Sequence, residues 1–304
     1  MISIKADQRA PVASSTNPIG TGSQMDLNDV LLQIDTYSDP TSPKAIEDAV
    51  GFVRLIGGKV SGLAVGVNFP IHSNRIADRL IGLSNMAADE LARSLVNGRA
   101  SLAAFTAVAE AAGVFGEVLL ERADYYAVAE HVALRARTRD LCMTPLGKPL
   151  DGQIEVAIGV IFDSGRPVLL YRAGTLSATE LQTVVVAWDG GRSAARALSD
   201  ALPILARAET VRVLTVINEK PSAVSGLAAE AARHLRAHGI DAAIDEVDGR
   251  NASIGQSLDA YLAKTACDLL VMGAYGRSRA RELILGGATQ HMLHDPKVPL
   301  FLAH

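Results

Sequence analysis

The sequence has few cysteines, few aromatic residues and no long apolar run. Only two of its 304 residues are cysteine, Cys142 and Cys267, and 4% are aromatic. Two cysteines, each beside an apolar segment, do not make the disulfide framework of a small secreted protein, so we expect packing residues in a reducing cytoplasm. Because no apolar run approaches the roughly 20 residues of a membrane span, we expect a soluble, cytoplasmic chain without a membrane partner.

The chain also lacks a strong excess of charge of either sign. Its formal net charge is -4, which gives no electrostatic footprint for nucleic acid. Hydrophobic residues make up 49% of the chain. Since few of these are aromatic, the core must be aliphatic, as in parallel sheets covered by helices. At 304 residues, the chain is long enough for two domains, each with its own core.

The amino-terminal segment, residues 1–24, is rich in proline, serine and glycine and has little apolar periodicity. It lacks the apolar core of a secretory signal, so we interpret it as a flexible leader, with Met25 as an alternative start. The rest of the chain would form one domain over residues 25–176 and a second over residues 177–304. The linker is expected near residues 174–177, where turn-forming residues follow a strand.

Apolar strand patterns alternate with amphipathic helix patterns along both halves of the chain. This alternation predicts a mostly parallel, doubly wound α/β sheet. In the first half, strands are predicted at 30–34, 59–67, 116–121, 140–143 and 167–171, and helices at 43–56, 75–112, 125–136 and within 154–162. In the second half, strands are predicted at 183–189, 211–217, 242–247, 268–273 and 298–302, and helices at 193–208, 222–237, 253–264 and from about 289.

Landmarks recur in the same order in the two halves, which indicates an internal duplication. Asp35 follows an apolar strand as Asp189 does, and the pair Asp140-Leu corresponds to Asp268-Leu. The first half carries extra residues, and these fall mostly in its long helical region. The duplication predicts two domains with the same order of elements.

A glycine-rich segment follows the predicted strand 268–273. Gly273 and Gly276 are followed, after nine residues, by Gly286 and Gly287, and a helix begins next. Glycines permit positive φ angles and let backbone N–H groups approach an anion, and the new helix adds its own N-terminal donors. This arrangement predicts a phosphate-binding loop, with a pair of tight turns as the alternative.

The spacing of these glycines, between a strand and a helix, resembles the nucleotide-binding signature of the universal stress protein family, in its tandem two-domain form. The resemblance extends from about residue 26 to the end and is stronger in the second half. It implies two Rossmann-like domains, similar to the adenine nucleotide alpha hydrolases, each with a five-stranded sheet. The domains would pair through their last strands as an intramolecular pseudo-dimer.

The same resemblance implies a stress-response or signalling protein that binds ATP, alone or with Mg²⁺. AMP or another adenine nucleotide stays open as the ligand. A homodimer of the whole chain and an unidentified protein partner also stay open.

Carried over to this sequence, the family pattern implies a nucleotide site on four elements of the second half. Val216 and Ile217 would contact the adenine. Asp189 would lie beside the ribose or the phosphates, with capping of the next helix as the alternative role. The other implied contacts are Ala187 and Trp188 along the approach, the backbone amides of Gly273, Gly276, Gly286, Gly287, Ala288 and Thr289, and the positive charge of Arg277.

The sequence departs from the family pattern in both halves. Gly287 stands where nucleotide-binding members usually have Ser or Thr, and Gly191 stands where they often have Ser. In the first half, the equivalent loop, residues 143–149, keeps one glycine and gains two prolines, which lack amide donors. Asp35 remains there, but we predict that this half kept the fold and lost the site.

Catalytic motifs are scarce. The sequence has no Walker lysine in the pattern G-x4-G-K-[ST], so we expect at most weak ATP hydrolysis. His291 and His294 could share one face of a helix, but no third metal ligand is evident. Two alternatives stay open: an interaction module of the same fold that binds no nucleotide, and a slow ATPase.

Overall fold

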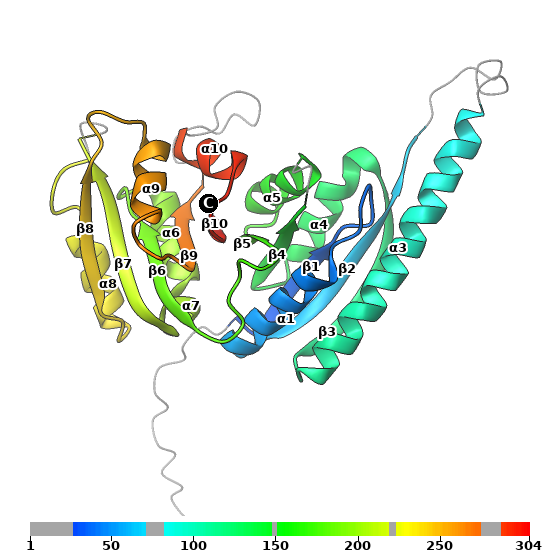
Figure 1. The fold of residues 1–304 in the computed structure, drawn as a ribbon, viewed down its shortest axis with the longest axis horizontal. Helices are drawn as coiled ribbons and strands as arrows, with labels where there is room; N and C mark the ends of the chain where they lie inside the picture. The colour runs from blue at the N-terminus through cyan, green and yellow to red at the C-terminus, as the bar shows by residue number, and fades with distance from the viewer. Residues whose placement is uncertain (1–26, 71–81, 148–150, 219–222, 275–286) are drawn as a thin grey trace, which may run out of the picture.

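The computed structural model describes residues 27–70, 82–147, 151–218, 223–274 and 287–304, and the strands in these ranges form one continuous sheet (Figure 1). The strand order is β3-β2-β1-β4-β5-β10-β9-β6-β7-β8. Each half contributes five strands, and all pairs within a half are parallel. The predicted α/β class, with a Rossmann-like arrangement in each half, is therefore confirmed.

The elements follow one another in the predicted alternation. The first half contains β1 (Asp29–Ile34), α1 (Pro43–Ile56), β2 (Lys59–Asn68), α3 (Leu83–Ala111), β3 (Phe115–Asp124), the short 3-10 helix η1 (Tyr125–Ala127), α4 (Val128–Ala136), β4 (Leu141–Leu146), α5 (Asp151–Asp163) and β5 (Val168–Arg172). The second half contains β6 (Leu181–Ala187), α6 (Arg192–Asp200), α7 (Leu202–Leu205), β7 (Ala208–Ile217), α8 (Ala229–Ala237), β8 (Ala242–Asp248), α9 (Ile254–Leu262), β9 (Leu269–Gly273), α10 (Gly287–His294) and β10 (Leu300–Ala303).

The helix α1 has the predicted bounds because local signals define both of its ends. The Ser42 side chain accepts a hydrogen bond from the backbone N–H of Ala45, and Pro43 occupies the first turn. Gly57 ends the helix in the left-handed region, with φ of 84°. Serine caps, an early proline and a left-handed glycine are the sequence features that start and stop a helix in water.

Two predicted helices of the second half are shorter than the apolar pattern indicated. The predicted helix 193–208 ends at Asp200, and the short α7 with Pro203 in its first turn follows it, because proline cannot continue a helix. Ala208 already belongs to β7. The predicted helix 222–237 begins only at Ala229, since Gly226 just before it has φ of 83°. In the first half, α3 begins at Leu83, and residues 71–81 lie outside the described ranges.

The two halves meet where their last strands pair. β5 and β10 run antiparallel, with Leu169 opposite Phe301 and Leu170 opposite Leu300. All other pairs in the sheet are parallel. Strand direction therefore reverses at this junction, and the carboxyl ends of the strands in the two halves lie at opposite edges of a single, long sheet.

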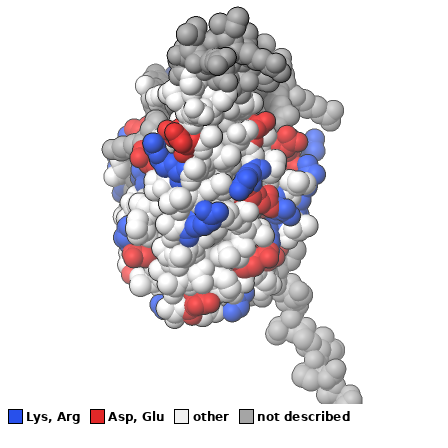
Figure 2. All heavy atoms as spheres, turned by 90° about the vertical axis from the view of Figure 1, so that its right-hand side faces the viewer, with Lys and Arg blue, Asp and Glu red and all other residues white. Residues whose placement is uncertain are grey.

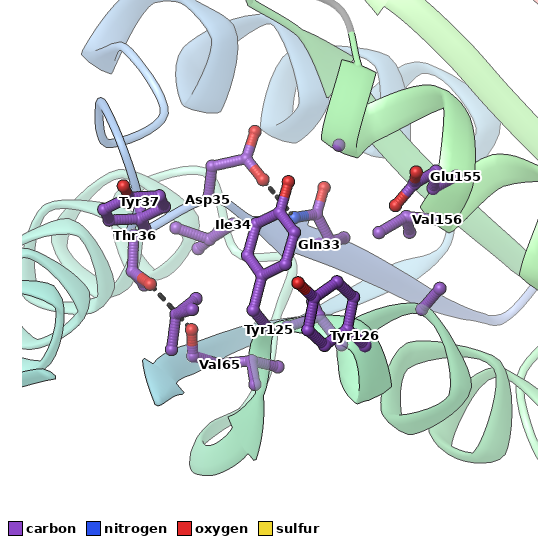
Figure 3. Close-up of a pocket in the computed structure, with 14 residues that line it drawn as sticks. Gln33, Ile34, Asp35, Thr36, Tyr37, Val65, Tyr125, Tyr126, Glu155 and Val156 are labelled. Carbon is purple, nitrogen blue, oxygen red and sulfur yellow. Dashed lines mark hydrogen bonds between the residues drawn. The ribbon is translucent and has the colours of Figure 1, made fainter. Parts of the chain in front are cut away.

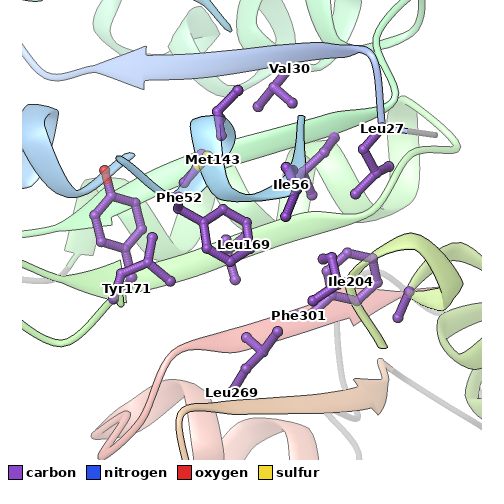
Figure 4. Close-up of a cluster of buried hydrophobic side chains, with 14 of the residues drawn as sticks. Leu27, Val30, Phe52, Ile56, Met143, Leu169, Tyr171, Ile204, Leu269 and Phe301 are labelled. Atoms are coloured by element: carbon purple, nitrogen blue, oxygen red, sulfur yellow. The ribbon is translucent and has the colours of Figure 1, made fainter. Parts of the chain in front are cut away.

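Helices cover both faces of the sheet, and each face has a hydrophobic core that runs through both halves. The helices α1, α3, α6, α7 and α8 pack on one face. The helices α4, α5, α9 and α10 pack on the other. Figure 4 shows the first of these cores at the junction, where Phe52 of α1, Leu169 of β5 and Phe301 of β10 lie together. The three side chains are almost completely buried, so apolar packing as well as strand pairing holds the halves together.

Equivalent aspartates fix the start of the first strand in each half. Asp140 Oδ2 accepts hydrogen bonds from the backbone N–H groups of Asn28 (2.9 Å) and Asp29 (3.0 Å). Asp268 Oδ2 accepts from those of Gln182 (2.7 Å) and Thr183 (2.8 Å). The recurrence of Asp-Leu in the sequence thus has a structural reason, because each carboxylate ties the start of one strand to the start of its neighbour.

The surface at the α3 end of the molecule carries both signs of charge, interspersed with neutral residues (Figure 2). Single-sign patches mark proteins that bind nucleic acid, and this face has no such patch among the residues drawn in colour. None of the helices in the described ranges combines the length and the apolar character that a membrane span requires.

Candidate functional site

The predicted site residues of the second half lie along the carboxyl edge of its sheet. Ala187 ends β6, Val216 and Ile217 end β7, and Gly273 ends β9. Because β6 lies between β7 and β9, these ends are neighbours. In open α/β sheets, ligands bind at this edge. Gly276, Arg277 and Gly286 lie outside the described residues.

Trp188 and Asp189 follow β6, and their surroundings differ. The Trp188 ring packs against the core, and its Nε1–H donates to the carbonyl of Leu227 at 3.1 Å. Asp189 is exposed, and its Oδ1 accepts the backbone N–H of Gly191 at 2.8 Å. Gly191 is the N-cap residue of α6 and has no side chain to cap the helix. Asp189 therefore shapes the turn before α6 and bonds the cap residue's own amide.

Close packing accounts for the glycine at position 273. A Cβ atom there would lie 2.3 Å from the backbone nitrogen of Ala194 and 2.5 Å from the carbonyl carbon of Ser193. Real Cβ contacts are never this short, so only glycine lets the first turn of α6 rest against the end of β9. Helix α6 in turn presents its amino-terminal end to the carboxyl edge of the sheet.

The first turn of α10 presents different residues to its surroundings. Gly287 is exposed, and among the described residues a Cβ atom at this position would lie no closer than 4.0 Å to its nearest neighbour, Ile254. Thr289 is buried, whereas Ala288 is partly buried. The backbone of Gly287 is thus open on the side that a substituent would occupy, and Thr289 packs inward.

The carboxyl edge of the first half has a feature that the sequence did not predict. A cavity of about 420 Å³ lies there between the β1–α1 loop, the end of β4 and the start of α5, and a smaller one of about 60 Å³ adjoins it. The two share Asp35, Tyr37, Tyr125 and Gly152. Figure 3 shows the smaller cavity with Asp35 and the tyrosine rings around it. A cavity of this size can take a small molecule.

Asp35 is the polar centre of this edge. Gln33 Nε2 donates to Asp35 Oδ1 at 2.6 Å, and Gln153 Nε2 donates to Asp35 Oδ2 at 2.7 Å. The Asp35 backbone N–H donates to Thr41 Oγ1 at 2.8 Å, which closes the loop after β1. Burial raises the pKa of the Asp35 carboxyl above its usual value, and the hydrogen bonds from Gln153 and Gln33 oppose this rise.

Aromatic side chains gather beside Asp35, although the chain has few of them. The ring of Tyr37 lies edge-on to Phe69, with centroids 4.9 Å apart, and Phe69 stacks on Tyr125 at 5.5 Å. Tyr125 also contacts Tyr126 edge-on at 5.3 Å. Tyr126 is 86% exposed, so this aromatic group borders the mouth of the cavities.

Two sequence signals could have located this edge. Gln33 interrupts the apolar strand Val30–Ile34, and a buried amide needs partners. Tyr125 and Tyr126 are adjacent in a chain with 4% aromatic residues. We noted Asp35 in the sequence, but its partner Gln153 lies on a distant helix, and only the fold brings the two together.

The candidate metal ligands and thiols have structural roles in the described residues. His291 Nε2 lies 2.6 Å from Asp259 Oδ2, which joins α10 to α9. Within the described ranges, no three His, Cys, Asp or Glu side chains gather as a metal site would require. Burial raises the pKa of the Cys142 thiol to about 12 and that of Cys267 to about 11. Both thiols stay protonated at neutral pH, as expected for packing residues.

Comparison with known proteins agrees with this architecture. Residues 180–304 match the model of the universal stress protein family. The chain is similar to a universal stress protein of known structure from Archaeoglobus fulgidus DSM 4304, with a TM-score of 0.69 and 19% identity over 91% of this chain and 96% of that chain. A functionally unknown protein from Pseudomonas aeruginosa PAO1 is similar over 91% of this chain and 92% of its own, with a TM-score of 0.51 and 14% identity.

At these identities, the two solved structures establish a shared fold and nothing further. Among curated proteins, none matches this chain. The match to the family model is therefore the finding that bears on function.

Proposed function

Since residues 180–304 match the model of the universal stress protein family, we propose that they bind an adenine nucleotide, ATP or AMP, at the carboxyl edge of β6, β7 and β9. The observation that supports this most directly is the meeting of the predicted contacts at one edge. Ala187, Val216 and Gly273 end three neighbouring strands there. These three residues were chosen from the sequence alone, without knowledge of which strands pair.

The described residues fit such a ligand in two respects. The partly exposed Ile217, next to the buried Val216, offers aliphatic surface for a base, and the exposed Asp189 offers a carboxylate to ribose hydroxyls. The first turn of α10 has room at Gly287, and the amide groups of a helix start suit a phosphate. A bound nucleotide would bring its negatively charged phosphates, and Mg²⁺ would bind together with them.

We propose a signalling role in the stress response for this module. A protein whose ligand changes its conformational preferences can report nucleotide levels to a partner without turning the nucleotide over. The sequence has no Walker lysine, which favours binding over rapid hydrolysis. A cytoplasmic location and an unidentified protein partner belong to the same proposal.

One observation favours a second candidate, an interaction module that binds no nucleotide. Close packing of α6 against β9 by itself requires glycine at position 273. That residue therefore does not distinguish a phosphate loop from a structural turn. The experiment must separate the two candidates by detecting the nucleotide directly.

The test is to purify the full chain, denature it and identify the released small molecules by mass spectrometry. We expect ATP or AMP from the wild-type chain and at least about tenfold less from Asp189→Ala, since a charge-assisted hydrogen bond contributes about 1.5–3 kcal/mol. Glu209→Ala is the matched control, because Glu209 is an exposed acid on β7 outside the proposed site.

Equal nucleotide from both variants would mean that Asp189 does not contact the ligand. No released nucleotide, together with no binding of added ATP or AMP, would contradict the proposal and favour the interaction module.

A further inference from the structure

Two residues that line the cavities of the first half have buried amide oxygens without partners. Gln33 and Gln153 are 3% and 9% exposed. Each donates its amide nitrogen to Asp35, so each must turn its amide oxygen away from the carboxylate. Gln33 Oε1 and Gln153 Oε1 are buried and have no hydrogen-bond partner within the described residues. Buried polar atoms without partners are rare in folded proteins.

The orientation of the two amides follows from Asp35. If either amide were turned around, its oxygen would face a carboxylate oxygen and repel it. The same carboxylate therefore fixes both amides, of which Gln33 lines the smaller cavity and Gln153 the larger one. A carboxylate also has about four lone-pair sites, and Asp35 uses two of them for the glutamines.

The described residues that line the cavities carry charge of one sign. Asp35, Asp39 and Glu155 line them, and the described lining residues include no Lys, Arg or His. Burial disfavours the charged form of Asp35. Within the described residues, the side chains that donate hydrogen bonds to its carboxylate are two neutral amides. A cation in the cavity would complete this arrangement.

Aromatic rings supply a second feature that suits a cation. Tyr37 and Tyr125 line both cavities, and Tyr126 lines the smaller one. Figure 3 shows the three rings around the space next to Asp35. The negative face of an aromatic ring attracts organic cations, and planar cations also stack on it.

We propose that this site of the first half binds a small, planar organic cation with N–H donors, of the amidinium or guanidinium class. Its N–H groups would donate to Asp35 and to the amide oxygens of Gln33 and Gln153, and its plane would lie against the tyrosines. A planar donor fork matches a carboxylate with two free lone pairs. The described cavity volume of about 420 Å³ accommodates a molecule of this kind.

The same chemistry disfavours other ligands. Three carboxylates would repel the phosphates of a nucleotide, and Pro145 at the end of β4 has no amide to offer them. An inorganic divalent cation would need a cluster of ligands that the described residues do not form. The proposal is independent of nucleotide binding in the second half.

The experiment uses three probes of nearly equal shape that differ in charge: benzamidine, which is a cation at neutral pH, neutral benzamide and anionic benzoate. Their binding to the full chain is measured by ligand-observed NMR and isothermal titration calorimetry. We expect saturable binding of benzamidine, at least about tenfold tighter than that of benzamide, and no binding of benzoate. ATP added in excess should not displace benzamidine.

Two variants locate the site, and a third is the control. Asp35→Asn keeps the shape of the side chain and removes its charge, so it should weaken benzamidine at least about tenfold and leave benzamide within about twofold. Tyr126→Ala removes an 86% exposed ring and should weaken benzamidine severalfold without unfolding the chain. Glu209→Gln makes the same change in net charge on the exposed surface of β7 and should have no effect.

Four outcomes would overturn the proposal. The first is no saturable binding of benzamidine up to about 10 mM. The second is equal affinity for benzamidine and benzamide. The third is benzamidine binding that survives both Asp35→Asn and Tyr126→Ala, which would place the cation elsewhere. Displacement by ATP would instead mean that this edge is a nucleotide site, and it would also overturn the proposal.

Discussion

Asp35 and Asp189 occupy equivalent places in the two halves, yet their surroundings are opposite in character. Val30 pairs with Leu141 as Val184 pairs with Leu269, and this register aligns Asp35 with Asp189. Asp35 is bound by two buried amides beside a cavity. Asp189 is exposed and accepts the backbone N–H of Gly191 in a turn.

The difference arises from a few neighbouring positions. When the two halves are aligned by this register, Gln33 corresponds to Ala187, Tyr37 to Gly191, and Pro145 to Gly273. The first half thus has an amide, an aromatic ring and a proline where the second has small residues. A backbone-lined edge suits phosphates, whereas a side-chain-lined, acidic edge suits a cation. One fold supports both because the sheet fixes only the position of the edge.

The largest expected effect concerns the small residue that lets α6 approach the sheet. Gly273→Val should destabilise the second half by about 3 kcal/mol or more, because its Cβ would overlap Ala194 and Ser193. Urea denaturation measures the loss. Gly287→Ala is the control, since its Cβ would meet none of the described residues closer than 4.0 Å, and it should change stability by less than about 1 kcal/mol, in the stabilising direction. Equal effects would mean that α6 does not pack against β9 as described.

The next effect tests whether the two halves are built alike at the amino-terminal ends of their strands. Asp140→Ala and Asp268→Ala should each cost about 2 kcal/mol, because each leaves two strand amides without their carboxylate. Denaturation of the two variants is compared with that of Asp241→Ala, whose side chain is 97% exposed. A cost in only one half would break the equivalence of the two aspartates.

A smaller effect concerns the missing hydroxyl in the second half. Gly287→Ser should tighten ATP by about tenfold relative to adenosine, because the new donor reaches only the phosphate chain. No described residue would lie closer than 4.0 Å to the new Cβ atom, so we expect the change to cause no strain. Titration of both ligands measures it. An equal shift for ATP and adenosine would show that the residue acts through the fold alone.

The smallest effect concerns the pH dependence of stability in the first half. Burial raises the pKa of Asp35 in the folded chain, so its folded form binds a proton more tightly than the unfolded chain does. Wild-type stability should therefore fall as pH rises through this raised pKa. Asp35→Asn removes the penalty and should be more stable than wild type at neutral pH, by about 1 kcal/mol.

The stability difference between Asp35→Asn and wild type should shrink as the pH falls and vanish below the ordinary pKa of an aspartate. Thermal melts across the acidic to neutral range measure it. A variant that is less stable than wild type at neutral pH would show that the carboxylate stabilises the fold, contrary to this account.

Much of the fold could be predicted from the sequence, because strand and helix patterns are local. Pro43 and Gly57 defined α1 at both ends. The misplaced boundaries occurred where one residue overrode a longer apolar pattern, as Pro203 did after α6 and Gly226 did before α8. Such breakers compete with periodicity, and periodicity alone does not show which of them wins.

The site was less accessible to sequence reasoning, because its contacts join distant segments. The pairing of β1 with β4 brings Gln153 beside Asp35, and no local pattern encodes that distance. The loss of the nucleotide site in the first half, predicted from the prolines of the loop 143–149, stays a prediction, and the acidic cavity at that edge was not predicted. The nucleotide contacts of the second half remain predictions, and those at Gly276, Arg277 and Gly286 lie outside the described residues.

The most direct test of the proposed division between the halves is the calorimetric titration of ATP into the full chain, Asp189→Ala and Asp35→Asn. The account predicts one ATP per chain, at least about tenfold weaker binding in Asp189→Ala, and no change in Asp35→Asn. Two ATP molecules per chain, or binding that is lost in Asp35→Asn and kept in Asp189→Ala, would contradict it.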